Sequence, residues 1–268
     1  MRRIFHYRDD DFSLSHTLDH IPDAGAFRMH THSETELFYF VQGKGVFHIE
    51  GTAYPLERGD LLIMAPSEAH YIEIDYSQSY ERKVLQFNTA FLDQFDPQGI
   101  LRRAITDREH GKQNLYRGLA HQQYWDAMMA SSGDARINVL CGLLPLLNQI
   151  RGAYSVTNSS PSGKDTVQQR VIRYLNEHLA QPLCLDNLCQ EFYISKSQLQ
   201  RLFREATGTT IYRYLTIKRL MLARQLVLAG ASPTHIYTQC GFTDYSTFYR
   251  AYTKHFGHSP SQDATAFQ

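Results

Sequence analysis

Four side chains that could bind a metal ion or a polar ligand lie in the first third of the chain. His30 and His32 are followed by Glu36, and His70 comes later, at the end of the run PSEAH. Two or three imidazoles and one carboxylate are a ligand set that a divalent first-row metal prefers in proteins. Because alternate residues of a strand share a face, we expect His30, His32 and Glu36 to converge on one strand, with His70 arriving from a neighbouring strand.

Three interpretations of these four residues remain open. They can line a polar effector pocket without metal, they can hold a divalent metal that assists ligand binding, or they can be ordinary hydrogen-bonded structural histidines. A divalent metal is thus a candidate cofactor but not a certain one. Arg28 lies on the same expected strand face as His30 and could anchor a carboxylate or hydroxyl of an effector. Phe38, Phe40 and Tyr71 could stack on a sugar ring, although such residues more often fill a barrel core.

A second group of candidate residues is polar and cationic, and it lies in the last third of the chain. Residues 186–208 read DNLCQEFYISKSQLQRLFREATG, which predicts a helix, a turn at Tyr193-Ile194 and a second helix with Ser195 as its N-cap. Leu199 and Phe203 would face inward. The opposite face of this second helix would carry Lys196, Gln200, Arg201 and Arg204.

Residues 241–260, GFTDYSTFYRAYTKHFGHSP, repeat this arrangement. Phe248, Tyr252 and Phe256 recur at helical spacing, and Gly257 should end the helix. The polar face between them carries Arg250 and Lys254. Either helix alone could simply pack on a core. A tandem pair of helices with basic outer faces, joined by one long helical stretch at 211–229, favours two helix-turn-helix units that enter the major groove of DNA.

The charges are distributed unevenly along the chain although the formal net charge is zero. Residues 1–160 carry 15 Lys and Arg against 20 Asp and Glu, a net charge of −5, and residues 161–268 carry 12 against 7, a net charge of +5. The basic part coincides with the paired helical units, as binding to phosphate would require. This asymmetry supports DNA binding without deciding it.

Length and composition indicate a two-domain protein of the cytoplasm. At 268 residues the chain can bury two separate cores. No apolar run reaches membrane-spanning length, and the N-terminal run MRRIFHYRDDDF lacks the apolar core of a signal peptide, so no membrane association is expected. The cysteines Cys141, Cys184, Cys189 and Cys240 have no zinc-binding spacing, and we expect free, packed thiols.

The elements that must position the first group of residues are strands. Short β-like runs separated by glycine turns indicate a sandwich or barrel; they lie at 37–41, 46–50, 61–65 and 80–92. A helix is expected at 134–152, with Ile137 and Leu143 on its buried face and a kink or break at Pro145. Residues 155–165 are rich in Ser, Pro and Gly and read as a linker. We therefore predict domains at residues 1–154 and 166–268.

The last third of the chain resembles the DNA-binding domain of the AraC/XylS family of bacterial transcription regulators. The resemblance covers residues 185–260 and rests on the spacing of Ser195, Leu199, Phe203 and Gly208, of Arg219, Ala223 and Leu226, and of Ile236, Gly241-Phe242, Phe248, Phe256-Gly257 and Ser259-Pro260. It implies base contacts from Ser197, Gln200 and Arg201 in the first unit and from Tyr245, Ser246, Thr247 and Arg250 in the second. Arg219 would be structural. Phosphate contacts, or merely a solvated face, are expected of Lys196, Arg204, Lys218 and Lys254.

The β-rich part resembles the cupin family. The pattern HxHxxxE at residues 30–36 is followed by Gly43, Gly59, Pro66 and His70. Many AraC-type regulators carry such a barrel, often without a working metal centre, and bind a small ligand, commonly a sugar, at its mouth. The resemblance implies an N-terminal all-β cupin-like barrel with following helices, for effector binding and dimerisation, and a C-terminal all-α tandem helix-turn-helix domain.

The leading hypothesis is a transcription activator, not an enzyme, that responds to a small molecule such as a sugar. Its expected partners are promoter DNA, the effector, RNA polymerase and a second copy of the chain. The helix at 134–152 is a candidate dimer surface, although packing on the barrel explains its apolar face nearly as well. Two alternatives remain: a cupin metalloenzyme, an isomerase or dioxygenase, with an appended DNA-binding domain, or an effector-independent DNA-binding protein.

Overall fold

The computed structural model describes residues 2–23, 27–118, 121–157 and 165–265. The chain divides into two compact units, one of residues 1–28 and 34–164 and the other of residues 165–268 with the short segment 29–33. Both chain neighbours of that segment, Arg28 and Glu34, lie in the first unit. Most of the predicted linker, residues 158–164, lies outside the described residues, so the domain boundaries stay predictions. No helix of the described residues is both long and apolar enough to cross a membrane.

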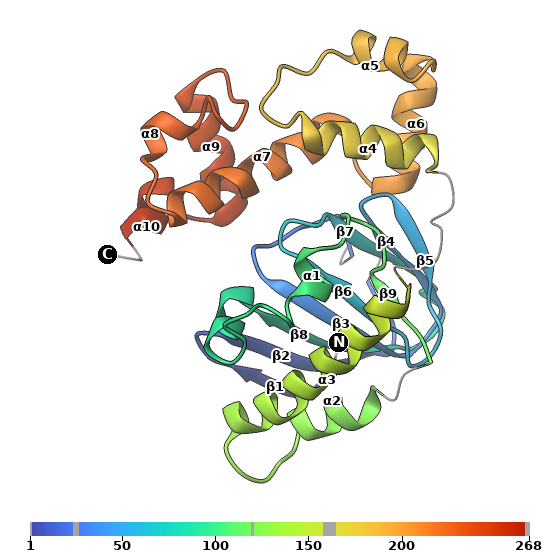
Figure 1. The fold of residues 1–268 in the computed structure, drawn as a ribbon. Coiled ribbons are helices and arrows are strands. Elements are labelled where there is room, and N and C mark those ends of the chain that lie inside the picture. Colours follow the sequence, from blue (N-terminus) through green and yellow to red (C-terminus); the bar gives the residue numbers. More distant parts are fainter. Residues whose placement is uncertain (1, 24–26, 119–120, 158–164, 266–268) are drawn as a thin grey trace. The chain divides into compact units, whose positions relative to one another are not determined.

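The first unit is built on two antiparallel sheets (Figure 1). Its strands are β1 (Arg2–Arg8), β2 (Phe12–Asp19), β3 (Thr35–Gln42), β4 (Gly45–Ile49), β5 (Thr52–Pro55), β6 (Leu61–Met64), β7 (His70–Ile74), β8 (Tyr80–Phe87) and β9 (Leu115–Tyr116). The larger sheet has the order β1-β2-β8-β3-β6-β9, and the smaller one has the order β5-β4-β7. Four helical segments accompany them: the 3-10 helix η1 (Thr89–Gln94), α1 (Arg103–Thr106), α2 (Gln122–Met128) and α3 (Ala135–Thr157).

Strand β3 is buried on both faces and separates two hydrophobic cores. Leu37 and Tyr39 belong to a core shared with α2 and α3, where Tyr39 stacks on the fully buried Trp125. Phe38 and Phe40 point the other way and belong to the core between the two sheets. Alternate residues of a strand face opposite sides, so the continuous apolar run LFYFV within this strand can fill both cores. The unit therefore has three layers: helices, the larger sheet and the smaller sheet.

Several sequence predictions for this unit need correction. The strand expected at 80–92 ends at Phe87, because Asn88 caps η1 by accepting the N–H of Ala90. Strands β1 and β2 were not predicted; β1 is a largely exposed edge strand, which weakens the apolar alternation that would reveal it. The four cysteines are free, as expected, but two of them are exposed rather than packed.

Helix α3 also differs from its prediction. Of the two outcomes predicted at Pro145, a kink or a break, the break is wrong: the helix continues through Pro145 and runs on to Thr157. Buried leucines flank the proline on both sides, Leu143 before it and Leu146 after it, and their packing on the larger sheet holds the helix together. Ile137, expected on the buried face, is 59% exposed.

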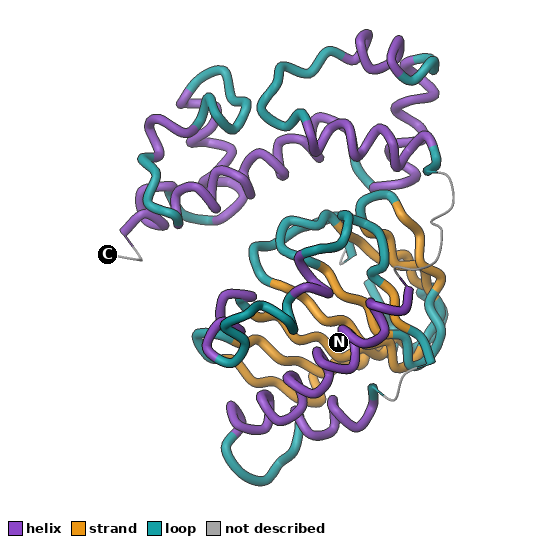
Figure 2. The backbone as a smooth tube through the Cα atoms, viewed as in Figure 1, coloured by secondary structure: helices purple, strands orange, loops and turns teal. Residues whose placement is uncertain are grey.

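From residue 165 on, the described residues of the second unit form helices joined by loops, without strands (Figure 2). Its helices are α4 (Val167–Glu177), α5 (Leu185–Glu191), α6 (Lys196–Thr207), α7 (Ile211–Leu228), α8 (Pro233–Ile236), α9 (Tyr245–Phe256) and α10 (Pro260–Thr265). Helix α7 serves both halves of the unit. Tyr214, in its first part, packs edge-on against Phe203 of α6 with ring centroids 5.4 Å apart. Ala223 and Val227, in its second part, share a core with Phe248 of α9.

Helices α6 and α9 have the same length and the same end signals. Each has twelve residues. Ser195 and Asp244 cap their N-termini by accepting the N–H of the third helical residue. Gly208 and Gly257 end them in the left-handed conformation, with φ of 68° and 80°. Ser195, Gly208 and Gly257 are the boundaries that the sequence predicts, and α5–α6 and α8–α9 form the two expected helix-turn-helix units.

Candidate DNA interface and effector site

The side chains predicted to face DNA on α6 are all exposed on one side of the helix. They are Lys196, Ser197, Gln200, Arg201 and Arg204. Residues four apart lie above one another on a helix, so this spacing forms one continuous stripe. The opposite side carries Leu199, Phe203 and Thr207, which are buried. The helix is thus anchored by its apolar face and presents amide, hydroxyl and guanidinium groups outward.

The corresponding face of α9 is partly polar and partly aromatic. Ser246, Thr247 and Arg250 are exposed, as predicted. Tyr245 is half-buried, because its ring packs edge-on against Tyr237 at 5.9 Å. Tyr245 therefore helps to hold the turn of the second unit in addition to any contact that it makes with a ligand.

Two cations of α6 are held by exposed carboxylates. Lys196 Nζ lies 2.7 Å from Asp186 Oδ1, and the hydrogen bond to Asp186 raises the pKa of Lys196, which therefore stays charged. Arg201 Nη1 lies 2.9 Å from Glu205 Oε1. Exposed pairs of this kind contribute little to stability, so both cations can exchange a carboxylate for a phosphate or a base.

Lys218 was expected to contact phosphate or to lie on a solvated face, and this prediction was wrong. Its side chain lies within the helical unit, only 4% exposed, with Nζ 5.7 Å above the ring of Tyr214. The position falls on the buried side of α7, which packs against other helices over most of its length. Lys254, predicted with it, is exposed on α9.

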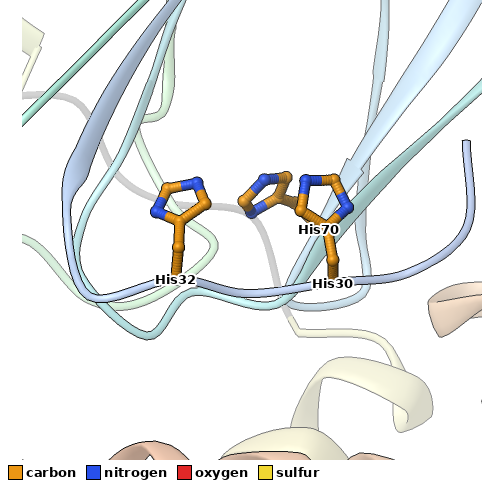
Figure 3. A group of neighbouring side chains, drawn as sticks. All are labelled: His30, His32 and His70. Carbon is orange, nitrogen blue, oxygen red and sulfur yellow. The ribbon is translucent and has the colours of Figure 1, made fainter. Parts of the chain in front are cut away.

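Three of the four predicted ligand residues in the β-rich region come together. His30, His32 and His70 each place one ring nitrogen in a common group, and these three nitrogens lie within 4.8 Å of one another. Figure 3 shows the three rings on the same side of the backbone segment that carries His30 and His32. His70, the first residue of β7, is 1% exposed, and His30 is exposed. The cluster therefore extends from the interior toward solvent.

Glu36 does not belong to this three-histidine cluster. Strand β3 begins only at Thr35, so His30 and His32 lie before the strand, and the expectation that they share its face with Glu36 was wrong. The carboxylate of Glu36 is buried, and its Oε2 accepts a hydrogen bond of 2.7 Å from Nε2 of Gln86, directly opposite on β8. Because Phe38, two residues on, faces the core between the sheets, the Glu36–Gln86 pair faces it too.

The remaining predicted effector contacts are placed less favourably. Arg28 is exposed and lies outside any strand, so the face that it was expected to share with His30 does not form. Phe38 and Phe40 are buried in the core between the sheets, which is the alternative that the sequence left open. Tyr71 stacks on His48, with ring centroids 4.4 Å apart and the planes 9° from parallel.

A buried polar network orients His70. Its Nδ1 lies 2.8 Å from the backbone oxygen of Glu68. A carbonyl oxygen only accepts, so Nδ1 carries a proton, and in the neutral ring Nε2 then has the lone pair. The carboxylate of Glu68 is fully buried and accepts hydrogen bonds from Arg108, at 2.5 and 2.8 Å, and from the backbone N–H groups of Ala65 and Gly111, both at 2.7 Å. Asn114 completes this Glu68 network.

The charge state of the Glu68 network follows from its geometry. Burial alone would lower the pKa of Arg108, but the attraction of Glu68 and its hydrogen bonds outweigh burial and raise that pKa. Sequence reasoning missed Glu68, Arg108 and Gln86. Only one signal was present, the position of Glu68 two residues before His70. The partner of Glu68 lies 40 residues away in a loop, and the partner of Glu36 depends on strand register.

Both parts of the chain match known protein families. A family model described as an AraC-like ligand binding domain matches residues 19–137, and one described as a helix-turn-helix domain matches residues 188–265. The HTH-type transcriptional activator RhaR of Escherichia coli O139:H28 is 28% identical over 254 residues, 88% of this chain and 86% of its own. RhaR of Escherichia coli K12 is 27% identical over 266 residues, with the same coverage. The structure of ToxT from Vibrio cholerae aligns with 94% of this chain and 97% of its own, at 12% identity and a TM-score of 0.41.

The two family matches together span most of the chain, in the order of the two units. Fold and site define a two-domain regulator, with a β-rich ligand-binding domain followed by a helical DNA-binding domain. The chain belongs to the AraC family of transcription regulators. It is therefore a DNA-binding regulator and not an enzyme.

Proposed function

We propose that this protein is an effector-controlled transcription activator that reads DNA with α6 and α9 and binds a sugar-like molecule in its β-rich unit. The observation that carries the DNA-binding part is the pair of twelve-residue helices with matching caps, each buried on one face and polar on the other. The similarity to RhaR, a transcriptional activator, supports the direction of regulation.

On the DNA, each recognition helix would lie in a major groove. Arg201 and Arg250 can each clamp O6 and N7 of a guanine, and Gln200 can pair with N6 and N7 of an adenine. The hydroxyls suited to either kind of base are those of Ser197, Ser246 and Thr247, with Tyr245 beside them. Lys196 and Arg204 lie at the two ends of the α6 stripe and suit the phosphate backbone, which positions the helix without reading sequence.

The effector would bind at the three-histidine cluster, with Glu36 and Arg28 nearby in sequence. Sugar hydroxyls both donate and accept hydrogen bonds. Neutral imidazoles do the same, and the proton on Nδ1 of His70 assigns Nε2 as an acceptor. The Glu36–Gln86 pair offers further carboxylate and amide groups between the sheets. This mixture of donors and acceptors suits a polyhydroxylated ligand better than an apolar one.

The same three histidines also fit a divalent metal. Three imidazole nitrogens with further positions open are a common ligand set, and the Glu68 carbonyl orients His70 as outer partners of metal-bound histidines do. His30, His32 and His70 would hold the ion. A bound metal would supply a Lewis-acidic contact for oxygens of the effector. Metal content of protein purified without chelators, compared with His32→Ala, tests this.

Regulation requires that the effector bind one state of the protein better than another, because a ligand of equal affinity for both would change nothing. We place this switch in a homodimer that acts in the cytoplasm and recruits RNA polymerase at a promoter.

The outer face of α3 supports the dimer: Ile137 is 59% exposed and Cys141 is exposed beside it. Ile137→Glu should then lower the mass measured by light scattering from that of a dimer to that of a monomer.

The sugar proposal is tested by thermal shift of the full-length protein against a panel of monosaccharides. A sugar that raises the midpoint should bind by calorimetry to wild type and to His20→Ala, an exposed histidine outside the cluster, but not to His32→Ala. The same sugar should change the affinity for a labelled promoter duplex. Binding that persists in His32→Ala would contradict the assigned site, and no response to any sugar would contradict the ligand class.

A further inference from the structure

Arg219, in the middle of α7, holds the turn that follows α4. Its Nε donates a hydrogen bond to the backbone oxygen of Leu179, and its Nη2 donates one to that of Gln181, both at 2.7 Å. Leu179 and Gln181 lie in the turn beyond Glu177, the last residue of α4, where buried or half-buried backbone carbonyls need a hydrogen-bond donor from elsewhere in the fold. The planar guanidinium satisfies two of them in one fixed geometry. The first helix-turn-helix half is thereby fastened to α7 at this point.

Gly241 brings the second half to the same place. It lies in the turn before α9 with φ of +80°, a conformation that glycine adopts far more easily than other residues. A Cβ at this position would lie 2.7 Å from Arg219 Nε and 2.7 Å from the backbone oxygen of Leu179. The backbone of the second turn therefore lies directly against the hydrogen bond that fastens the first.

These contacts form a node, which we define as Arg219, Leu179, Gln181 and Gly241. Apart from this node, the two helix-turn-helix halves are connected through α7: α6 packs on the first part of that helix, and α9 packs on its second part. The cation is costly to place here, since burial lowers the pKa of Arg219 and the two carbonyls that accept its hydrogen bonds are neutral. The contact is half-buried, and the planar guanidinium holds the two carbonyls in one fixed geometry.

We propose that this node fixes the distance and angle between α6 and α9, so that Arg219 and Gly241 set the spacing of the two DNA half-sites without touching DNA. The inference rests on the proposed use of both recognition helices. One added base pair moves the second half-site by about 3.4 Å along the duplex and by about 35° around it. A rigid pair of helices cannot follow this change, whereas a pair joined by α7 alone can follow part of it.

The test uses the full-length protein and a duplex enriched from a random library by the wild type. Affinity is measured for this duplex and for versions with one base pair inserted or removed between the two contacted blocks. Arg219→Met removes both hydrogen bonds and keeps the length of the side chain, and Gly241→Ala places a methyl group against them. Gly230→Ala is the matched control, because Gly230 also has a positive φ, +92°, but its Cβ would meet nothing within 4 Å.

We expect wild type and Gly230→Ala to lose at least about tenfold in affinity for each change of spacing, the cost of one good base contact. Arg219→Met and Gly241→Ala should lose less than about threefold. Arg219→Lys, which keeps the charge but not the fork, should lie between them. Thermal melting checks that each variant folds; if Arg219→Met does not, the comparison of Gly241→Ala with Gly230→Ala decides.

Two results would overturn the inference, and they are distinguishable. If Arg219→Met and Gly241→Ala bind more weakly but keep the spacing profile of the wild type, the node is only a structural contact. If the wild type itself tolerates every spacing, the proposed reading of DNA by two linked helices fails, and this inference fails with it.

Discussion

The Glu68 network allows a quantitative prediction for Arg108→Met. Glu68 and Arg108 are both 0% exposed in their side chains, and the variant removes two charge-assisted hydrogen bonds from a carboxylate that stays buried. Breaking one side of a buried ion pair costs about 3–5 kcal/mol. With a denaturant slope of about 2 kcal/mol per M of urea, a loss of about 4 kcal/mol lowers the unfolding midpoint by about 2 M.

The assay can be confined to the β-rich unit. Trp125 is the one tryptophan of the chain, and its side chain is fully buried in the core between the larger sheet and α3. Its fluorescence in urea therefore reports on this unit in the full-length protein. Arg102→Met is the matched control, because Arg102 pairs with Asp93 on the surface, where the two side chains are 39% and 51% exposed. We expect the control to change stability by about 0–1 kcal/mol.

A double variant separates the ion pair from the rest of the network. Replacing a buried ion pair by apolar residues often restores stability, and that rule alone predicts that Glu68→Leu combined with Arg108→Met recovers stability. We expect no recovery, because the N–H groups of Ala65 and Gly111 would lose their acceptor inside the fold. A midpoint for Arg108→Met within the range of the Arg102→Met control would refute the reasoning, as would a double variant as stable as wild type.

Two further predictions concern other buried polar groups. Asp263→Asn removes the charged acceptor of the Tyr252 hydroxyl, 2.5 Å away, and should destabilise the helical unit by about 1–3 kcal/mol. Circular dichroism should show this as a lower melting temperature. Asp186→Asn, on the surface, is the control, and an equal fall in melting temperature for both variants would contradict the prediction. His121 is 1% exposed, and burial lowers its pKa. Because its folded pKa lies below the unfolded value of about 6.5, stability of the β-rich unit should fall as the pH decreases below that value. His121→Gln should flatten this dependence in urea titrations followed by Trp125, and an unchanged slope would count against it.

The DNA-binding half could be predicted closely from the sequence, because its signals are local. Ser195 caps α6 and Gly208 ends it through interactions within one or two turns of helix. The inward residues Leu199 and Phe203 follow directly from helical periodicity. The error at Lys218 has a tertiary cause: α7 is packed over most of its surface, so a polar residue on it does not mark a solvated face.

The candidate effector site could be predicted only in part. The pattern of histidines identified His30, His32 and His70, which the fold brings together. The position of Glu36 relative to them depended on where β3 begins, and Thr35 rather than an earlier residue starts the strand. The groups that orient the site, Glu68 with Arg108 and Gln86 with Glu36, are joined by register and loop packing across 40 to 50 residues, as the sequence separations of these hydrogen bonds show.

The central claim is that α6 and α9 read DNA together, in successive major grooves. It is tested most directly by enriching a random duplex library with wild type, Arg201→Ala and Arg250→Ala, all full length. We expect each variant to lose preference at one base pair, at a cost of about 1–3 kcal/mol, and the two positions to lie about 10 base pairs apart. Loss at the same position in both variants, or equal weakening on all sequences, would contradict the account.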